Sequence, residues 1–170
     1  MKKIAWIAFV LLAFVSSLPA QNRVDTKWHC TKPSEFHRVA VGAAPNHNYT
    51  IIQGSCRSMA SNAQFPEKEC SYTEFQELQD AFVRVHGSMN ATMENGDKVF
   101  YSYEGSFPAD TTKPFSQRWK LVNGTGRYQS IMGNGICTGL VHADGTGDME
   151  CSGKYSTGKR IVDSVREQAR

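Results

Sequence analysis

The stretch from residue 137 to 151 reads CTGLVHADGTGDMEC, in which small or apolar side chains alternate with polar ones. Such alternation is typical of the two strands of a β-hairpin. A three-residue turn at 143–145, ending in Gly145, puts Cys137 directly opposite Cys151. A rung of this kind brings the opposing side chains close enough for a disulfide. The stretch therefore predicts a hairpin closed by a Cys137–Cys151 bridge, with two buried reduced thiols as the alternative.

A neighbouring hairpin upstream follows the same reasoning. The segments 83–93 and 98–107 both carry apolar or small side chains at their odd positions. A two-residue turn between them would send the two apolar rows to opposite faces of the hairpin. A three-residue turn ending in Gly96 keeps both rows on one face. We therefore predict that Met93 pairs with Asp97 across the turn.

The rest of the chain shows further short strands. Nine of the 14 glycines fall between Gly124 and Gly158, so tight turns separate the strands in this half. Together the segments form an antiparallel meander of about eight strands, which can close into a barrel or fold into a sandwich. We favour an all-β fold closed into a small barrel, with at most one or two short helices. The remaining strands are predicted at 36–42, 48–56, 116–122 and 127–132.

One short helix is predicted directly after Cys70. Ser71 and Glu74 have the spacing of a capping box, in which each side chain bonds to the backbone of the other residue at a helix start. Three apolar side chains then fall on one helical face: Phe75, Leu78 and Phe82.

The first 20 residues have the layout of a secretory signal. Lys2 and Lys3 precede an unbroken apolar run from residue 4 to 15, and small or polar residues lead to a cleavage site after Ala20. The run is shorter than a bilayer span, although an uncleaved anchor is the alternative. We predict a signal peptide at 1–20, a β-barrel domain at 21–158 and a C-terminal tail at 159–170. The mature protein would be soluble and exported, either periplasmic or secreted.

Charge and cysteine content agree with this compartment. Loss of Lys2 and Lys3 lowers the net charge from +3 to +1, which gives no basis for binding nucleic acid or an anionic membrane. No later stretch is long enough for a membrane span. The remaining chain has five cysteines without CxxC spacing, and export favours disulfides. We predict a second bridge between Cys30 and Cys56, which leaves Cys70 either free or paired across a homodimer.

The stretch from residue 124 to 139, GTGRYQSIMGNGICTG, resembles a recurrent segment of allene oxide cyclase-like barrels, the class that includes the dirigent proteins. It has Gly-Thr-Gly, an aromatic residue, an Ile and a Gly-x-Gly bend, and it is most similar to the bacterial branch. The resemblance covers residues 80–156. It implies an eight-stranded antiparallel barrel around a central apolar cavity. Known activities of the class run from cyclising fatty-acid epoxides to orienting radical coupling, and some members have no known chemistry. No catalytic motif of the class matches this sequence residue by residue.

Seven residues are candidates for lining such a cavity. Aromatic and methionine side chains would give it apolar walls with polar handles, although the same residues could simply form a filled core. Glu104 would be an acid of raised pKa if its row faced the cavity, and a solvated surface residue otherwise. The candidates are Met89, Tyr101, Tyr103, Glu104, Trp119, Tyr128 and Met132.

No metal site or cofactor is predicted. The histidines match no compact ligand pattern, and none can be placed beside Cys70 to form a nucleophilic pair. They are His29, His37, His47, His86 and His142.

Three functions remain open from the sequence. The first is a barrel that binds a small apolar molecule without chemistry of its own. The second is a cyclase or isomerase on the same barrel, which requires titratable side chains that point inward. The third is a protein–protein interaction module, for which the unpaired cysteine and an exposed Phe100 would be the clues. The ligand and the catalytic residues are unknown at this stage.

Overall fold

A computed structural model describes residues 22–42 and 46–158. The predicted signal peptide and C-terminal tail lie outside these residues. The described chain consists of nine strands and one turn of 3₁₀ helix. The strands are β1 (Asn22–Cys30), β2 (Glu35–Ala40), β3 (His47–Ser61), β4 (Glu67–Gln79), β5 (Phe82–Met93), β6 (Lys98–Pro108), β7 (Phe115–Gly124), β8 (Ile131–Val141) and β9 (Gly147–Thr157), with the 3₁₀ turn η1 at Gly126–Tyr128.

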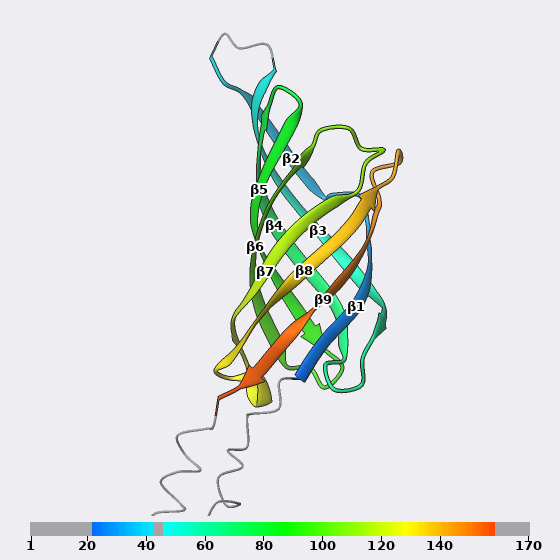
Figure 1. The fold of residues 1–170 in the computed structure, drawn as a ribbon, viewed down its shortest axis with the longest axis vertical. Helices are drawn as coiled ribbons and strands as arrows, with labels where there is room; N and C mark the ends of the chain where they lie inside the picture. Colours follow the sequence, from blue (N-terminus) through cyan, green and yellow to red (C-terminus); the bar gives the residue numbers. More distant parts are fainter. Residues whose placement is uncertain (1–21, 43–45, 159–170) are drawn as a thin grey trace, which may run out of the picture.

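Eight of the strands close into an antiparallel barrel, as predicted (Figure 1). From β3 to β9 each strand pairs with the next one along the chain, and β1 pairs with both β9 and β3. This double pairing removes the free edges that an open sheet would leave. β2 is the ninth strand and lies outside the closed ring, on the upper part of the β3 edge that β1 occupies lower down.

Both hairpins predicted from side-chain parity are confirmed. The N–H of Met93 donates to the carbonyl of Asp97 over 2.8 Å, and Gly96 takes a φ of +84° in the turn. At the second hairpin the N–H of His142 donates to the carbonyl of Thr146, also over 2.8 Å. The positive φ at the last turn residue explains why glycine stands there.

The predicted helix after Cys70 is wrong, because this segment is part of β4. Its even positions face the barrel interior and its odd positions face outward, as Phe75 does. From Cys70 to Gln79 the backbone pairs with β3 on one side and β5 on the other, so its N–H and C=O groups have partners along the whole segment. A capping box would satisfy only the groups at a helix start. The apolar spacing of three and four residues arose by coincidence, because Phe75 and Leu78 lie on opposite faces of β4 and Phe82 begins β5.

The strand predicted at 127–132 is also corrected. Residues 126–128 form the 3₁₀ turn η1, and β8 begins only at Ile131. Tyr128 is buried in this turn at the lower end of the barrel rather than in a wall strand. The other predicted strands exist, with ends that differ by a few residues.

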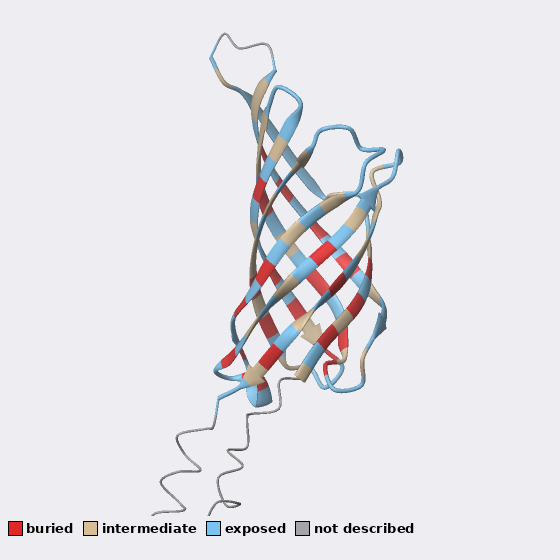
Figure 2. Ribbon diagram, in the orientation of Figure 1, coloured by how far each residue is buried: buried red, intermediate tan, exposed pale blue. Residues whose placement is uncertain are grey.

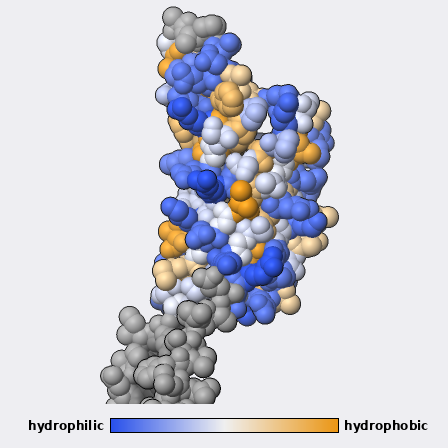
Figure 3. Space-filling view, in the orientation of Figure 1, coloured by the Kyte–Doolittle hydropathy of each residue, from blue (hydrophilic) through white to orange (hydrophobic). Residues whose placement is uncertain are grey.

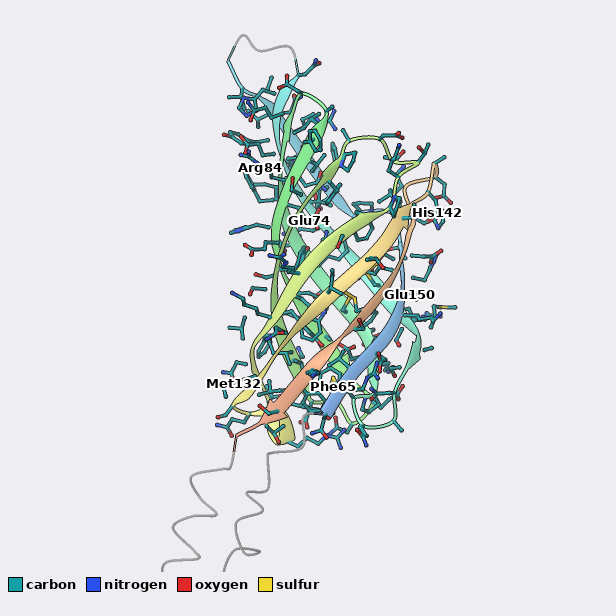
Figure 4. The ribbon with its side chains drawn as sticks, in the orientation of Figure 1. Phe65, Glu74, Arg84, Met132, His142 and Glu150 are labelled. Atoms are coloured by element: carbon teal, nitrogen blue, oxygen red, sulfur yellow. A yellow bond between two sulfur atoms is a disulfide. The ribbon has the colours of Figure 1, made fainter. Side chains whose placement is uncertain are left out.

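The lower end of the barrel is filled by a floor of aromatic side chains. The ring of Phe65 packs 5.5 Å from that of Tyr128 and 4.7 Å from that of Tyr155, measured between ring centroids. Figure 2 shows buried segments concentrated in the lower and middle barrel, and Figure 4 places Phe65 at the lower end. These buried rings close the lower end of the barrel to solvent, and the burial of their apolar surface stabilises the fold.

Two disulfides form, as predicted: Cys30–Cys56 between β1 and β3, and Cys137–Cys151 between β8 and β9. Cys70 remains a free thiol and is buried, so it is not placed to bridge two chains. Cys30–Cys56 lies at the top of the β1–β3 pairing, the seam that closes the ring.

Removal of either disulfide should lower the free energy of unfolding. Cys30→Ala/Cys56→Ala should cost about 3.5 kcal/mol and Cys137→Ala/Cys151→Ala about 3 kcal/mol, because the first bridge closes the longer loop. Urea unfolding of both variants measures the two losses. Cys70→Ala is the single-substitution control, since it leaves both bridges intact. A wild-type stability for either double variant would contradict the prediction.

Candidate functional site

The interior of the barrel contains a cavity of about 520 Å³ above the aromatic floor. Its upper rim is formed by the loops that follow β1, β6 and β8, where Lys32, Asp110 and Thr146 line the opening. The face of the molecule seen in Figure 3 is largely hydrophilic, with a few apolar patches. The inward-facing side chains thus line a lumen that is closed by the aromatic floor below and opens at the upper rim.

Aromatic side chains cover parts of the walls of this lumen where glycines on neighbouring strands leave room for them. A Cβ on Gly54 would come within 2.5 Å of the Tyr72 hydroxyl, and one on Gly87 within 2.5 Å of the Tyr103 hydroxyl. The indole of Trp119 covers two glycines, Gly135 on β8 and Gly153 on β9. Each ring thus occupies the space of an absent side chain, which keeps the lumen open.

Four of the seven candidates from the sequence line the cavity: Met89, Tyr101, Tyr103 and Trp119. Tyr128 is buried in the floor instead. The prediction that Met132 and Glu104 line the cavity is wrong, because both lie on the outer surface, and 64% of Met132 is exposed. Both occupy even positions of strands whose odd positions face inward. Glu104 sits between the outward-facing His86 and Arg118 on the adjacent strands.

The sequence reasoning missed two acids that do face the lumen, Glu67 and Glu74 on β4. For Glu74 the missed signal was the alternation of a strand, whereas Glu67 lies before that stretch, on the other side of a register shift between Glu67 and Glu69. Within residues 70–78 the even positions read Cys, Tyr, Glu, Gln, Leu, which is an inward strand face. The capping-box interpretation assigned Glu74 to a helix start and hid this alternation.

Glu67 is almost completely buried, at 2% exposure, and both of its carboxyl oxygens accept hydrogen bonds. The hydroxyl of Thr26 donates to one oxygen over 2.5 Å and that of Tyr101 donates to the other over 2.6 Å. Desolvation raises the pKa of Glu67 to about 7, and the two hydrogen bonds offset only part of that effect. This carboxyl ties β1, β4 and β6 together just above the floor.

Glu74 lies higher in the barrel, where Figure 4 places it in the upper half. The hydroxyl of Tyr103 donates to its Oε2 over 3.0 Å, and the Nε2 of Gln76 donates to its Oε1 over 2.6 Å. Burial raises the pKa of Glu74 above its ordinary value. Burial also raises the pKa of Tyr72 to about 12 and that of Tyr103 further, so both phenols keep their protons at neutral pH.

Charge is distributed unevenly along the cavity. Among the residues that the structure describes, neither Glu67 nor Glu74 has an ion-pair partner, and the other charged lining residues are exposed at the rim. The rim residues are Lys32, Arg38, Asp110, Lys113 and Asp148. The deep lumen therefore contains acidic groups without a basic counterpart.

Trp119 contributes a buried polar group that has no hydrogen-bond partner among the described residues. This group is the N–H of its indole ring. The ring packs edge-on against Tyr101, with centroids 5.5 Å apart.

The predicted absence of a metal site was based on the histidines, and two of them meet at the rim. His29 and His142 both contact Asp148, with N···O distances of 2.7 and 2.8 Å. These two hydrogen bonds lower the pKa of Asp148. Over residues 22–42 and 46–158 no group of three or more metal-ligating side chains is arranged to hold an ion.

In comparison with known proteins, no protein-family model and no curated protein matches the sequence. No helix in the described residues is long and apolar enough to cross a bilayer. The class that the fold and the site define is a closed antiparallel β-barrel with an aromatic-lined lumen containing two buried carboxyl groups.

The buried carboxyls should make the protein less stable as the pH rises. Unfolded Glu67 ionises at its ordinary pKa, whereas the folded protein holds that proton up to about pH 7. The folded state therefore binds more protons in this window, and the free energy of unfolding falls by about 3 kcal/mol through it. Glu74 acts in the same direction.

Urea unfolding at about pH 5 and about pH 8 measures this loss. Glu67→Gln keeps the shape of the side chain but cannot ionise, so its stability should change less between the two pH values. The exposed Glu104→Gln is the matched control and should behave like the wild type. An unchanged pH dependence in Glu67→Gln would show that this carboxyl is not responsible.

Proposed function

We propose that this protein is an exported β-barrel that binds a small, largely apolar molecule in its lumen. The observation that carries the proposal is the open lumen of about 520 Å³, whose volume is in the range of ligand sites. A barrel of eight strands can be filled completely by its own side chains, so an unfilled interior needs a reason. The two disulfides and the predicted signal peptide support export.

The pairing of Gly54 with Tyr72 gives a direct test of this proposal. The three atoms that an added Cβ would meet first all belong to the Tyr72 side chain, so Gly54→Ala should push that ring into the lumen without distorting the backbone. Binding of the neutral apolar fluorophore N-phenyl-1-naphthylamine should then weaken about tenfold. Fluorescence titration measures the change.

The matched control removes the displaced ring. Gly54→Ala/Tyr72→Ala should recover binding of the fluorophore, because the added methyl then meets no ring. Failure of the wild type to bind N-phenyl-1-naphthylamine, together with no bound small molecule in native mass spectrometry, would contradict the proposed function. Unchanged binding of the fluorophore by Gly54→Ala would place it outside the lumen.

A cyclase or isomerase on the same barrel is a second candidate, and the inward-facing Glu67 and Glu74 favour it. A buried carboxyl of raised pKa can give or take a proton beside an apolar substrate. The resemblance to allene oxide cyclase-like barrels points the same way, although none of its catalytic motifs matches here. Glu104, the acid considered for this role from the sequence, lies on the outer surface and is not proposed again.

Binding and isomerisation can be separated through the molecule that co-purifies with the protein. Cyclisation or isomerisation leaves the mass unchanged but alters chromatographic retention. An enzyme should yield different isomers from the wild type and from Glu74→Gln, because the variant lacks the proton donor. A binding protein should yield the same molecule from both, which is the result we expect.

The third candidate, an interaction module, has lost both of its sequence clues. Cys70 is buried inside the barrel, and Phe100 on the outer wall is partly covered rather than exposed. We therefore do not propose the disulfide-linked homodimer.

A further inference from the structure

One row of backbone-paired residues starts at Glu74 and winds around the barrel. Backbone pairing connects Glu74 on β4 through Gly87 to Tyr103 on β6, and from there to Trp119 on β7. The row continues through Gly135 on β8 and Gly153 on β9. Two aromatic side chains thus cover three glycines, and the phenol of Tyr103 crosses β5 to reach the Glu74 carboxyl.

The rings in this row cover glycine backbone and also line the cavity. Tyr72, on the same strand as Glu74, adds a third ring in the same way over Gly54. Tyr72 and Tyr103 remain half-buried, which leaves part of each ring in contact with the open cavity. The face of an aromatic ring is its electron-rich surface and attracts cations rather than anions.

The acidic groups of the lumen also favour a cationic ligand. Glu74 is buried without a basic partner among the residues described here, and burial alone disfavours its ionised form. A cation inside the lumen would supply the missing counter-charge, whereas an anion would be repelled. The exposed lysines and arginine at the rim are solvated and contribute little to selection at this depth.

We infer that the ligand of the lumen is an organic cation: an ammonium group that sits between the Glu74 carboxylate and the rings of Tyr72 and Tyr103, with an apolar remainder. This inference rests on the proposed function and specifies its ligand class. The apolar part extends toward the rim, where Phe107 and Phe115 pack together with ring centroids 5.8 Å apart. Desolvated cation–π contacts and a carboxylate at one end form the type of cage that binds quaternary ammonium groups.

The test compares three probes that share one alkyl chain and differ only in charge: decyltrimethylammonium, decanol and decyl sulfate. Isothermal titration of the purified protein, below the micelle concentration of each probe, should show the cation binding about tenfold or more tightly than the other two. Glu74→Gln should weaken the cation about tenfold and leave decanol unchanged. The surface variant Glu104→Gln should bind all three as the wild type does.

A second pair of variants tests the rings. Tyr72→Leu should weaken binding of the cation but not of decanol, because it removes a π face and keeps an apolar side chain. Tyr72→Phe keeps the π face and should bind the cation nearly as the wild type does. Loss of the cation's advantage in Tyr72→Phe as well would assign the effect to the hydroxyl and overturn the cage.

The outcomes distinguish this inference from the proposed function. Equal or tighter binding of decanol or decyl sulfate by the wild type would overturn the cation assignment while the lumen remained a binding site. Full cation binding by Glu74→Gln would do the same. If none of the three probes binds and N-phenyl-1-naphthylamine does not bind either, the lumen is not a binding site and both proposals are wrong.

Discussion

The close packing of an aromatic ring on a backbone that lacks a side chain is the contact on which the interior of this barrel depends. An eight-stranded ring is just wide enough for inward side chains to meet across the axis and fill it. Here Tyr72, Tyr103 and Trp119 turn sideways onto neighbouring strands, where glycines leave room for them. The apolar area of each ring is buried against the wall, so the protein gains the stability of a core without filling its centre.

Because the rings cover their neighbours, polar groups on the same row are also fixed in place. Tyr103 can reach the Glu74 carboxyl only by passing over Gly87, and the hydrogen bond that results holds both side chains against the wall. Glu67 has the equivalent relation to Tyr101 nearer the floor. Both acids are therefore held by phenols, and the low polarity that surrounds them keeps their pKa values high.

Much of this fold follows from the sequence, because strand pairing obeys parity. Once a glycine-terminated turn is placed, every cross-strand partner follows, which is why the Cys137–Cys151 bridge and both hairpins could be predicted. Parity did not help where two patterns overlapped. On β4 the spacing of apolar residues also fits a helix, and only pairing with the strands on either side, β3 and β5, decides between them. Glu74 was missed for that reason, because the capping-box interpretation assigned it to a helix start.

The β1–β3 seam has a consequence for access to the lumen. Along one edge of β3 the partner changes from β1 to β2, and Cys30–Cys56 is located where the change occurs. Below this bridge the wall is a continuous hydrogen-bonded ring, and above it β2 lies outside that ring. The covalent link therefore fixes the upper end of the β1–β3 pairing and limits how far down the two strands can separate. In a reducing compartment this link would be absent, and the backbone hydrogen bonds between β1 and β3 alone would determine how wide the upper opening is.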